Sequence, residues 1–469
     1  KSFFDLSETY IFKLIFFMNV HFIAIGGSAM HNLAIAMHLM GDVVTGSDDE
    51  IFHPSKGRLM KYGLLPSNIG WDVSKIHDQL EAVILGMHAR SDNPELIKAQ
   101  QLGLKIYSYP EFIYEKTKCK KRIVIGGSHG KTTITSMILH VLNYNGIIHD
   151  YMVGAQLDGF ECMVRLSDDA KIAVLEGDEY LSSPIDPRPK FHLYQPTIGL
   201  ISGIAWDHIN VFPTFQSYVE QFDIFANLIK DSGYLIYYTG DQHIKKIKNS
   251  LKDTISQVGY STHNHLVEDG KTYLIDGKDK YPVLVFGEHN LQNLSGALEV
   301  CLKIGLDKKQ FYEAIQSFSG ASKRMELVAE KDNTVVYKDF AHSPSKLKAT
   351  TEALSNQFPK RRLVACMELH TFSSLNSSFL EQYRGSMHSA DVAYVYFSPE
   401  TLKHKKLKEI SADDIHNAFG SDNLVVFTSS DDLVNALKSI NWNNTNLLLM
   451  SSGNFGGIEI KDLAKSLLT

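Results

Sequence analysis

The chain of 469 residues has few cysteines, no excess of basic residues and no apolar run long enough for a membrane span. Its four cysteines lie far apart and form no CxxC pair, which argues against a disulfide framework or a zinc site and is typical of the reducing cytoplasm. With a formal net charge of −6, the chain lacks the bulk positive field of a nucleic-acid-binding protein. The apolar stretch at residues 10–20 is interrupted by Lys13 and is too short to cross a membrane.

The first residues are expected to form an extension without function. No small-residue cleavage site follows the apolar stretch, so a signal peptide is a poor interpretation. The chain runs instead directly into a strand and a pair of glycines, and Met18 is a candidate for the natural start. We therefore predict a non-functional segment over residues 1–17.

The order of the remaining segments predicts several α/β units. A chain of this length is too long for one hydrophobic core, so about three domains are expected. Short β-rich runs alternate with helical segments, a pattern that indicates βαβ units and parallel sheets. We predict domains over residues 18–117, 118–319 and 320–469, the last beyond a small polar stretch at 318–322 that is suited to a hinge.

The strongest local signal is a glycine-rich loop between an apolar strand and a helical run. Its residues are Gly126, Gly127, Ser128, His129, Gly130, Lys131, Thr132 and Thr133. Glycines let backbone N–H groups turn toward phosphate oxygens, and the following helix N-terminus adds a positive dipole end. Lys131 can reach the β- and γ-phosphates, and the Thr132 hydroxyl can bind Mg²⁺. The loop departs from GxxxxGK[ST] because Ile125 replaces the first glycine, yet its position and ending predict nucleotide binding.

Acidic residues and a histidine follow two further strand-like runs. Glu176 and Glu179 come after residues 171–175, and His208 comes after residues 198–201. The carboxyl ends of parallel strands face the crevice in which open α/β sheets bind ligands. Because hard cations prefer oxygen ligands, Glu176 or Glu179 could hold magnesium. A solvated acidic loop and a structural histidine are the ordinary alternatives, but three strand ends at one crevice favour a site.

Polar residues later in the chain could complete that site. Asn290 and Asn293 lie three residues apart on one face of a predicted helix, where their amides could bind a purine edge, although N-capping is the plainer interpretation. Beyond the hinge, Arg324 could hold a transferring phosphoryl group. Asp339 and His342 could position nucleotide or substrate, but each is also compatible with a surface ion pair or a turn.

A second glycine turn lies near the start of the chain. Gly26 and Gly27 follow the first predicted strand, and Asp48 stands about 20 residues further on, as in dinucleotide-binding folds. The spacing G-x-G-x-x-G is absent. A loop that binds a diphosphate is therefore favoured over a nicotinamide site.

In this order, the motifs resemble those of the Mur ligases of bacterial cell-wall synthesis. The resemblance covers residues 18–469. It implies a Rossmann-like N-terminal domain for a UDP-sugar, a central P-loop domain for ATP and a Rossmann-like C-terminal domain for the incoming amine. It further implies a cytoplasmic enzyme that uses ATP and Mg²⁺ to convert the carboxylate of UDP-N-acetylmuramate into an acyl phosphate. An amino acid or peptide amine would then displace phosphate.

The resemblance also assigns residues to each ligand. For the UDP-sugar it implies Gly26, Gly27, Ser28, Met30, Asp48 and His88. For ATP it implies Gly127, Ser128, His129, Gly130, Lys131, Thr132, Thr133, His289, Asn290, Asn293, Arg324, Asp339 and His342. The residues implied for magnesium are Thr132, Glu176 and His208. Catalysis is assigned to Lys131, Glu176, His208 and Arg324.

Two branches of the family, which differ in the amine that they add, resemble this chain. One adds L-alanine to UDP-N-acetylmuramate, and the other adds the tripeptide L-alanyl-γ-D-glutamyl-meso-diaminopimelate during recycling. We favour the tripeptide branch because three segments resemble it, at residues 86–94, 340–344 and 454–457. The usual arginine-containing pattern is absent around residues 367–372. Also missing is the lysine that several relatives carbamylate, with Asp223 near its place, and in that lack the chain resembles the alanine-adding branch.

Three other kinds of protein stay open. A nicotinamide oxidoreductase would make no use of the loop at residues 126–133. A non-catalytic nucleotide-binding protein would bind ATP without substrate-dependent release of phosphate. A relative of folylpolyglutamate synthetase would share the central fold but would lack a separate UDP-sugar domain, which argues against it here. The sequence does not decide between a monomer and a homodimer.

Overall fold

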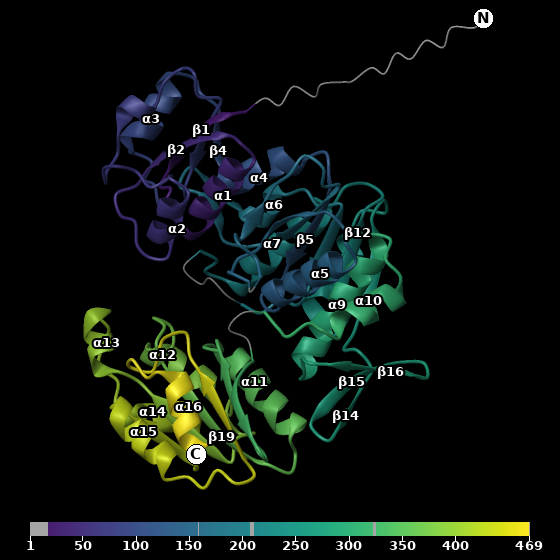
Figure 1. Ribbon diagram of the computed structural model, residues 1–469, viewed down its shortest axis with the longest axis vertical. Helices are drawn as coiled ribbons and strands as arrows, with labels where there is room; N and C mark the ends of the chain where they lie inside the picture. Colours follow the sequence, from purple (N-terminus) through teal and green to yellow (C-terminus); the bar gives the residue numbers. More distant parts are fainter. Residues whose placement is uncertain (1–16, 158, 207–210, 322–324, 469) are drawn as a thin grey trace, which may run out of the picture.

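The computed structural model describes residues 17–157, 159–206, 211–321 and 325–468, which form three α/β sheets in succession along the chain (Figure 1). The predicted α/β fold with three domains is thereby confirmed. Most of the predicted extension, residues 1–16, lies outside the described residues. Within the described part of the chain, no helix is both long enough and apolar enough to cross a membrane.

The first sheet has four parallel strands in the order β2-β1-β3-β4. These strands are β1 (Asn19–Ile23), β2 (Val43–Ser47), β3 (Ala82–Leu85) and β4 (Ile106–Ser108). The accompanying helices are α1 (Ser28–Leu39), α2 (Ser55–Lys61), α3 (Pro94–Gln101) and α4 (Tyr109–Thr117). All four residues of β3 are buried, as expected for a parallel strand that is covered on both faces.

The second sheet has seven strands in the order β13-β12-β11-β5-β8-β6-β7, all parallel except β7. These strands are β5 (Lys121–Gly126), β6 (Asp150–Met152), β7 (Val164–Arg165), β8 (Ile172–Glu176), β11 (Ile198–Ile201), β12 (Tyr234–Tyr238) and β13 (Ser256–Tyr260). The helices of this region are α5 (Lys131–Tyr144), α6 (Lys190–Leu193), α7 (Phe215–Asn227), α8 (Gln242–Ile247), α9 (Glu288–Lys303) and α10 (Lys308–Ile315). Because β5 lies between β11 and β8, the loops after these three strands lie side by side.

Two small antiparallel sheets accompany the second sheet. One pairs β9 (Leu181–Ser183) with β10 (Asp186–Pro189). The other has three strands, β14 (His265–Glu268), β15 (Lys271–Asp276) and β16 (Asp279–Val283), and it projects toward the third sheet (Figure 1).

The third sheet has six strands in the order β17-β18-β22-β19-β20-β21, of which β17 alone is antiparallel. These strands are β17 (Glu326–Lys331), β18 (Thr334–Asp339), β19 (Arg362–Glu368), β20 (Val392–Tyr396), β21 (Leu424–Phe427) and β22 (Thr445–Met450). The helices are α11 (Pro344–Gln357), α12 (Ser377–Leu380), α13 (Pro399–His404), α14 (Ala412–Phe419), α15 (Ser430–Lys438) and α16 (Ile460–Leu467). Every residue of β22 is buried, which is consistent with its central position.

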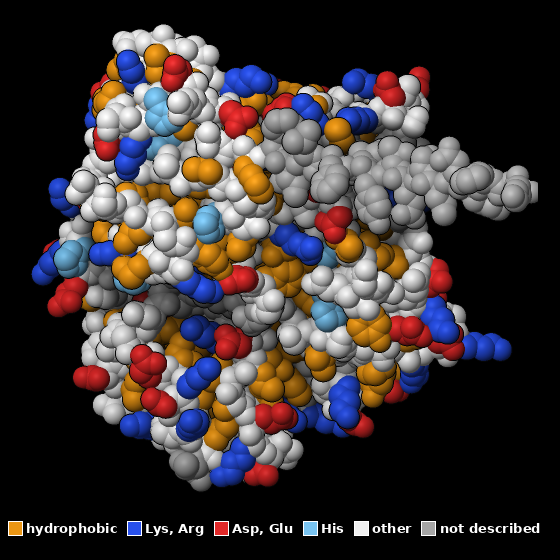
Figure 2. Space-filling view, turned by 45° about the horizontal axis from the view of Figure 1, so that its top comes forward, with side chains coloured by type: hydrophobic (Ala, Val, Ile, Leu, Met, Phe, Trp, Pro, Cys, Tyr) orange, Lys and Arg blue, Asp and Glu red, His pale blue; other side chains and the backbone are white. Residues whose placement is uncertain are grey.

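The surface of the molecule has no dominant sign of charge on the face shown in Figure 2. Acidic and basic side chains are interspersed there, and neither forms a continuous patch. The four cysteines are free thiols; Cys119 is exposed and the other three are buried. Both observations agree with the expectation of a globular protein without a disulfide framework.

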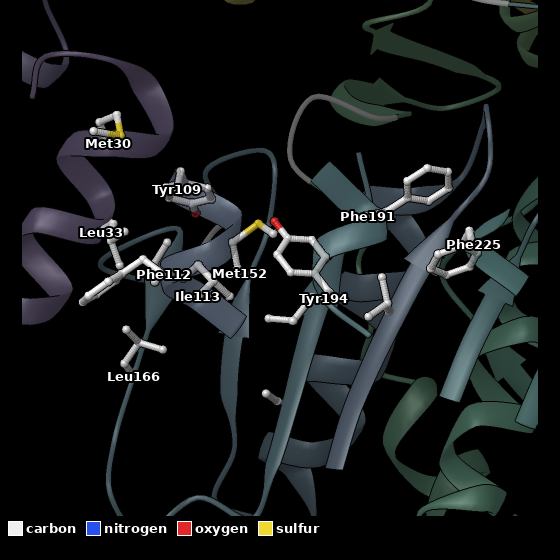
Figure 3. Close-up of a cluster of buried hydrophobic side chains, with 14 of the residues drawn as sticks. Met30, Leu33, Tyr109, Phe112, Ile113, Met152, Leu166, Phe191, Tyr194 and Phe225 are labelled. Atoms are coloured by element: carbon white, nitrogen blue, oxygen red, sulfur yellow. The ribbon is translucent and has the colours of Figure 1, made fainter. Parts of the chain in front are cut away.

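The first and second sheets are joined by a shared apolar core. Leu33 of α1 and Phe112 of α4 belong to the same buried cluster as Met152, Leu166 and Tyr194, which come from the region of the second sheet (Figure 3). Burial of apolar area is the main source of stability for such a contact. We therefore expect the first two α/β units to behave as one body.

Candidate active site

A cavity of about 520 Å³ lies where the carboxyl ends of the central strands of the second sheet meet the third α/β unit. Its wall includes the loop at residues 128–133, Glu176 at the end of β8, and residues 202–205 after β11. The opposite side is formed by the beginning of α9 and by the first turns of α11. The sequence predicted that these strand ends would meet at one crevice, because ligands bind at the carboxyl edge of parallel sheets.

The glycine-rich loop has a backbone conformation that other residues would not adopt without strain. Gly127 and Gly130 have φ angles of +125° and +81°. A Cβ atom at Gly127 would lie 2.2 Å from Ser202 Oγ, and one at Gly130 would lie 2.2 Å from Asn293 Oδ1. Helix α5 begins directly afterwards, at Lys131. Its first N–H groups lack partners within the helix, so the loop and helix together form a cradle suited to phosphate oxygens.

Lys131 is held on the inner side of this loop. Its ammonium group donates hydrogen bonds to the carbonyl oxygen of Gly127 at 2.7 Å and to Glu179 Oε2 at 2.8 Å. Burial alone would lower the pKa of Lys131, but the carboxylates of Glu179 and Asp178 outweigh burial and raise it. The side chain is therefore a protonated cation at neutral pH, as a phosphate-binding lysine must be.

Thr132 and Glu176 supply adjacent oxygen atoms next to the loop. The Thr132 hydroxyl donates to Glu176 Oε1 at 2.8 Å, and the backbone N–H of Gly154 donates to Glu176 Oε2 at 2.8 Å. Burial raises the pKa of the Glu176 carboxyl, which a bound cation would oppose. A hydroxyl and a carboxylate are the donor types that Mg²⁺ prefers, and this ion commonly keeps several waters. The donor set therefore fits magnesium.

A third predicted magnesium ligand, His208, lies outside the described residues. Among the residues that the structure does describe, no group of three or more His, Cys, Asp or Glu side chains is arranged to hold a metal ion. Arg324 also falls outside the described part of the chain. The assignments of His208 and Arg324 stay predictions.

The predicted purine-binding residues line the cavity from α9. His289, Asn290 and Asn293 all belong to its wall. The Asn290 amide nitrogen donates one hydrogen bond to the carbonyl oxygen of Phe286 at 2.9 Å, which leaves its oxygen and its second N–H for a ligand. Asn293 lies against Gly130 and thereby connects α9 to the phosphate loop.

The third α/β unit contributes Asp339 and the beginning of α11 to the cavity. Asp339 accepts backbone hydrogen bonds from Met325 at 2.7 Å and from Ala341 at 2.6 Å, so it orders the entry into this unit. Ser345 Oγ lies 3.1 Å from His129 Nε2, a contact between α11 and the phosphate loop. His342 is half-buried and is not part of the wall, although it lies two residues before the start of α11.

Most of the predicted nucleotide residues meet in this cavity. Those in its wall are Ser128, His129, Gly130, Lys131, Thr132, Thr133, Glu176, His289, Asn290, Asn293 and Asp339. Several wall residues were not predicted, namely Tyr238, Asp241, Gln292, Ser345 and Lys346. Tyr238 is the last residue of β12 and Asp241 follows that strand, so the rule that located Glu176 could have found them.

The predicted UDP-sugar loop lies at the carboxyl edge of the first sheet. The Gly26 N–H donates to Asp48 Oδ2 at 2.6 Å, and burial raises the pKa of Asp48 to about 6. Ser28 is exposed at the N-terminus of α1, where an anion could bind. His88 is also exposed. Met30 differs from these residues because its side chain is buried in the core (Figure 3).

Family comparisons match three consecutive parts of the chain. Residues 19–118 match the Mur ligase family, catalytic domain. Residues 125–301 match the Mur ligase middle domain, and residues 323–453 match the Mur ligase, glutamate ligase domain.

Similar individual proteins fall into two groups. The UDP-N-acetylmuramate–L-alanine ligase of Caldicellulosiruptor saccharolyticus is 31% identical over 85% of this chain and 88% of its own. The UDP-N-acetylmuramate–L-alanyl-gamma-D-glutamyl-meso-2,6-diaminoheptandioate ligase of Haemophilus influenzae is 26% identical over 95% of this chain and 99% of its own.

Solved structures of both groups share the fold. The UDP-N-acetylmuramate–alanine ligase of Thermotoga maritima aligns with a TM-score of 0.67 at 20% identity, over 96% of this chain and 98% of its own. The murein peptide ligase of Psychrobacter arcticus aligns with a TM-score of 0.61 at 23% identity, over 96% of this chain and 99% of its own.

Proposed function

This chain belongs to the Mur ligase family of ATP-dependent enzymes that form C–N bonds, and from that premise we propose that it joins the carboxylate of UDP-N-acetylmuramate to an amine. The observation that carries the proposal is the cavity that combines Lys131, Thr132 and Glu176 with α9 and α11. The proposed domains are residues 18–117 for the UDP-sugar, 118–319 for ATP and 320–469 for the amine. Since ATP and UDP-sugars are cytoplasmic substrates, we place the reaction in the cytoplasm.

The reaction needs ATP because a carboxylate and an amine do not condense readily in water. Transfer of the γ-phosphoryl group to the carboxylate gives an acyl phosphate and ADP, which provides a good leaving group. The uncharged amine then attacks the carbonyl carbon, the bond between that carbon and the phosphate oxygen breaks, and a proton is lost from nitrogen. The products are an amide and inorganic phosphate. Positioning and charge neutralisation contribute most of the catalysis in phosphoryl transfer.

The residues of the cavity have separable proposed roles. Backbone N–H groups of the glycine-rich loop and the Lys131 ammonium would bind the β- and γ-phosphates. Thr132 and Glu176 would hold magnesium, which would supply positive charge to neutralise the phosphoryl oxygens. Asn290 would bind the purine edge from α9. We propose Arg324 as a further cation that the third domain adds beside the transferring phosphoryl group.

We propose the tripeptide L-alanyl-γ-D-glutamyl-meso-diaminopimelate as the amine substrate. The three segments that resemble the tripeptide branch support it, as does the relative from Haemophilus influenzae, which aligns over nearly its whole length. L-Alanine is the second candidate, because the relative at 31% identity is an L-alanine ligase. The usual arginine-containing pattern is absent around residues 367–372, which begin at the end of β19 in the proposed amine domain, so this segment does not identify the amine.

The proposal is tested by release of phosphate from ATP and Mg²⁺ in the presence of UDP-N-acetylmuramate and one amine at a time. Release that requires the tripeptide supports the recycling ligase. Release with L-alanine instead assigns the second candidate. Absence of release with either amine, while ATP still binds, contradicts the proposed substrates and favours a non-catalytic nucleotide-binding protein.

A further inference from the structure

We propose that Glu179 and Tyr218 are positioning residues for Lys131, acting from beneath the phosphate loop. The proposal rests on the assignment of Lys131 to ATP made above. Both side chains are completely buried, and neither belongs to the wall of the cavity. They are therefore placed to act on Lys131 and not to touch a substrate.

The polar atoms behind the loop form one directed chain of hydrogen bonds. The backbone N–H of Ala205 donates to Ser128 Oγ at 2.8 Å. Ser128 Oγ lies 2.9 Å from the Tyr218 hydroxyl, which donates to Glu179 Oε1 at 2.9 Å. The Tyr218 hydroxyl donates its single proton to Glu179. In the bond between the two hydroxyls, Ser128 is therefore the donor and Tyr218 the acceptor. Lys131 completes the chain by donating to both oxygens of Glu179, at 3.0 and 2.8 Å.

These hydrogen bonds connect the two ends of the phosphate loop with the segments that follow the neighbouring strands β8 and β11. Ser128 lies at its beginning, and Lys131, which also bonds the Gly127 carbonyl oxygen, lies at its end. Glu179 follows β8, and Ala205 follows β11. A shift of any one of these elements would change the direction of the Lys131 ammonium group. Holding a charged group in its working geometry before the substrate arrives is a recognised source of catalytic advantage.

Tyr218 is held firmly enough to fix the orientation of Glu179. It lies in the first turns of α7, and its ring packs edge-on against Phe222 with centroids 5.2 Å apart. Phe212 contacts it from the preceding loop, with centroids 5.5 Å apart. A tyrosine hydroxyl in such apolar surroundings needs hydrogen-bond partners. Ser128 and Glu179 are these partners, so the hydroxyl has a defined place.

Glu179 supplies the counter-charge for the buried Lys131 ammonium. The Lys131 Nζ atom lies 2.8 Å from Glu179 Oε2, and the two side chains are only 15% and 1% exposed. The Glu179 carboxylate accepts hydrogen bonds from both Lys131 and Tyr218, so these two groups fix its orientation. Removal of one partner of such a pair leaves the other charge buried and uncompensated.

Helix α7 thus contacts the phosphate loop through Tyr218 and not through Asp223. The sequence placed Asp223 near the position of the lysine that several relatives carbamylate. In the structure Asp223 accepts a hydrogen bond from Ser250 Oγ at 2.7 Å and is not part of the cavity wall. The hydroxyl of Tyr218, one turn earlier on the helix, is the atom that contacts the phosphate-loop network.

The test compares Tyr218→Phe and Glu179→Gln with the control Tyr312→Phe in the full-length protein. Tyr312 is also a buried tyrosine with a hydroxyl hydrogen bond, to His263 at 2.9 Å, but it is remote from the loop. Dissociation constants for ATP and for AMP are measured by titration with Mg²⁺, together with kcat and the unfolding temperature. AMP lacks the β- and γ-phosphates, so its affinity does not depend on Lys131.

We expect Tyr218→Phe to weaken ATP binding or to lower kcat by about tenfold, as for a hydrogen bond to a charged group. The affinity for AMP should stay unchanged in the same variant. Glu179→Gln should have a larger effect, about 100-fold, because the Lys131 ammonium loses a charged hydrogen-bond partner. Tyr312→Phe should lower only the unfolding temperature.

Two results would overturn the proposal. The first is a Tyr218→Phe variant with unchanged ATP affinity and kcat, and the second is equal loss of ATP and AMP binding, which indicates general damage to the fold. If Glu179→Gln fails to fold, the comparison of Tyr218→Phe with Tyr312→Phe is sufficient to test the proposal. Failure of the proposed function looks different, because the parent protein then shows no turnover with any amine. The selective loss of ATP affinity still tests Glu179 and Tyr218 in that case.

Discussion

At the scale of single residues, Lys131 connects the nucleotide cavity with the buried network behind it. Lys131→Ala removes the cation proposed for the β- and γ-phosphates, and we expect turnover to fall by about 100-fold or more. Binding of the UDP-sugar should be retained, because Gly26 and Asp48 lie at the edge of a different sheet. Phosphate release and titration with UDP-N-acetylmuramate measure the two effects. Ligation at the parent rate in this variant would remove Lys131 from the mechanism.

Asp48 gives the first sheet a pH-dependent contribution to stability. Its pKa is about 6 in the folded protein and 3.8 in a model peptide, mainly because of burial. The folded state therefore holds the extra proton between these values, and the associated stability is lost as the pH rises through 6. Asp48→Asn keeps an acceptor for the Gly26 N–H without the charge. The variant should gain roughly 1–3 kcal/mol over the parent at pH 8 and nothing at pH 4.

Thermal unfolding of the parent and of Asp48→Asn across this pH range checks the prediction. The unfolding temperature of the variant should exceed that of the parent at pH 8, and the two curves should converge under acidic conditions. Parallel curves would show that Asp48 does not titrate in the folded protein. Loss of UDP-sugar binding in the same variant would separately support the assignment of Asp48 to the UDP-sugar.

Individual site residues differ in how readily the sequence discloses them. Gly127, Lys131 and Thr132 lie within six consecutive residues of the chain, so their spacing alone predicted a phosphate loop. Tyr218 lies 90 residues from its partner Ser128, and nothing in its local sequence distinguishes it from a core tyrosine. Its role arises only when α7 packs behind the loop. Contacts of this kind depend on tertiary structure and leave no local pattern.

At the scale of elements, the order of the central strands explains why distant motifs meet. The loops after β5, β8 and β11 are neighbours because these three strands are adjacent and parallel. Alternation of strands and helices predicted such a sheet, and the rule for carboxyl ends predicted that Lys131 and Glu176 would come together. The contribution of α11 was not predicted, since Ser345 and Lys346 carry no recognisable motif. Only the packing of the third unit brings them to the cavity.

Gly287 controls how closely α11 approaches the central domain. It precedes α9 with a φ angle of +84°, and a Cβ atom there would lie 2.4 Å from Ala353 Cβ on α11. Gly287→Ala should push α11 away from the cavity and raise the KM for ATP by about tenfold, beyond the roughly 1 kcal/mol that such a backbone conformation costs alanine. Steady-state kinetics with varied ATP measures this effect.

Gly305 offers a matched control for that substitution. It follows the same helix with a φ angle of +105°, but a Cβ atom there would have no neighbour within 4 Å. Gly305→Ala should therefore lower the unfolding temperature by a similar amount without changing the KM for ATP. Equal kinetics in the two variants would mean that the distance between α9 and α11 is unimportant for nucleotide binding.

At the scale of the whole molecule, the two junctions between α/β units differ in kind. The first and second units share a continuous apolar core, and Asn32 also accepts a hydrogen bond from the Met163 N–H at 2.9 Å across the junction. The third unit meets the second mainly through α11, where Gln357 bonds Thr272 at 2.9 Å and Ser345 contacts His129. The sequence predicted three units and a hinge, but the extent of each interface depends on which faces meet, and periodicity does not encode that.

Relative motion is the expected behaviour of units whose interface is not a large apolar core, and here Phe286 is the residue of the second unit that joins the apolar cluster of the third. In the structure, α11 already lines the nucleotide cavity, so this arrangement corresponds to a closed state of the site. We expect the ligand-free protein in solution to sample more open arrangements of the third unit, and nucleotide to favour the closed one because both sides of the cavity would contact it. A non-hydrolysable ATP analogue with UDP-N-acetylmuramate should therefore reduce the radius of gyration measured by small-angle scattering.

The variant Gly287→Ala separates closure from ligand binding in that experiment. With Ala353 held away from α9, the ligands should bind at high concentration without compacting the protein to the same extent. Gly305→Ala should compact like the parent, because its change meets no neighbouring atom. An unchanged radius of gyration in the parent under saturating ligands would show that the third unit is already docked in solution. Closure by nucleotide would then be wrong, and Asp339 and α11 would belong to a preformed site.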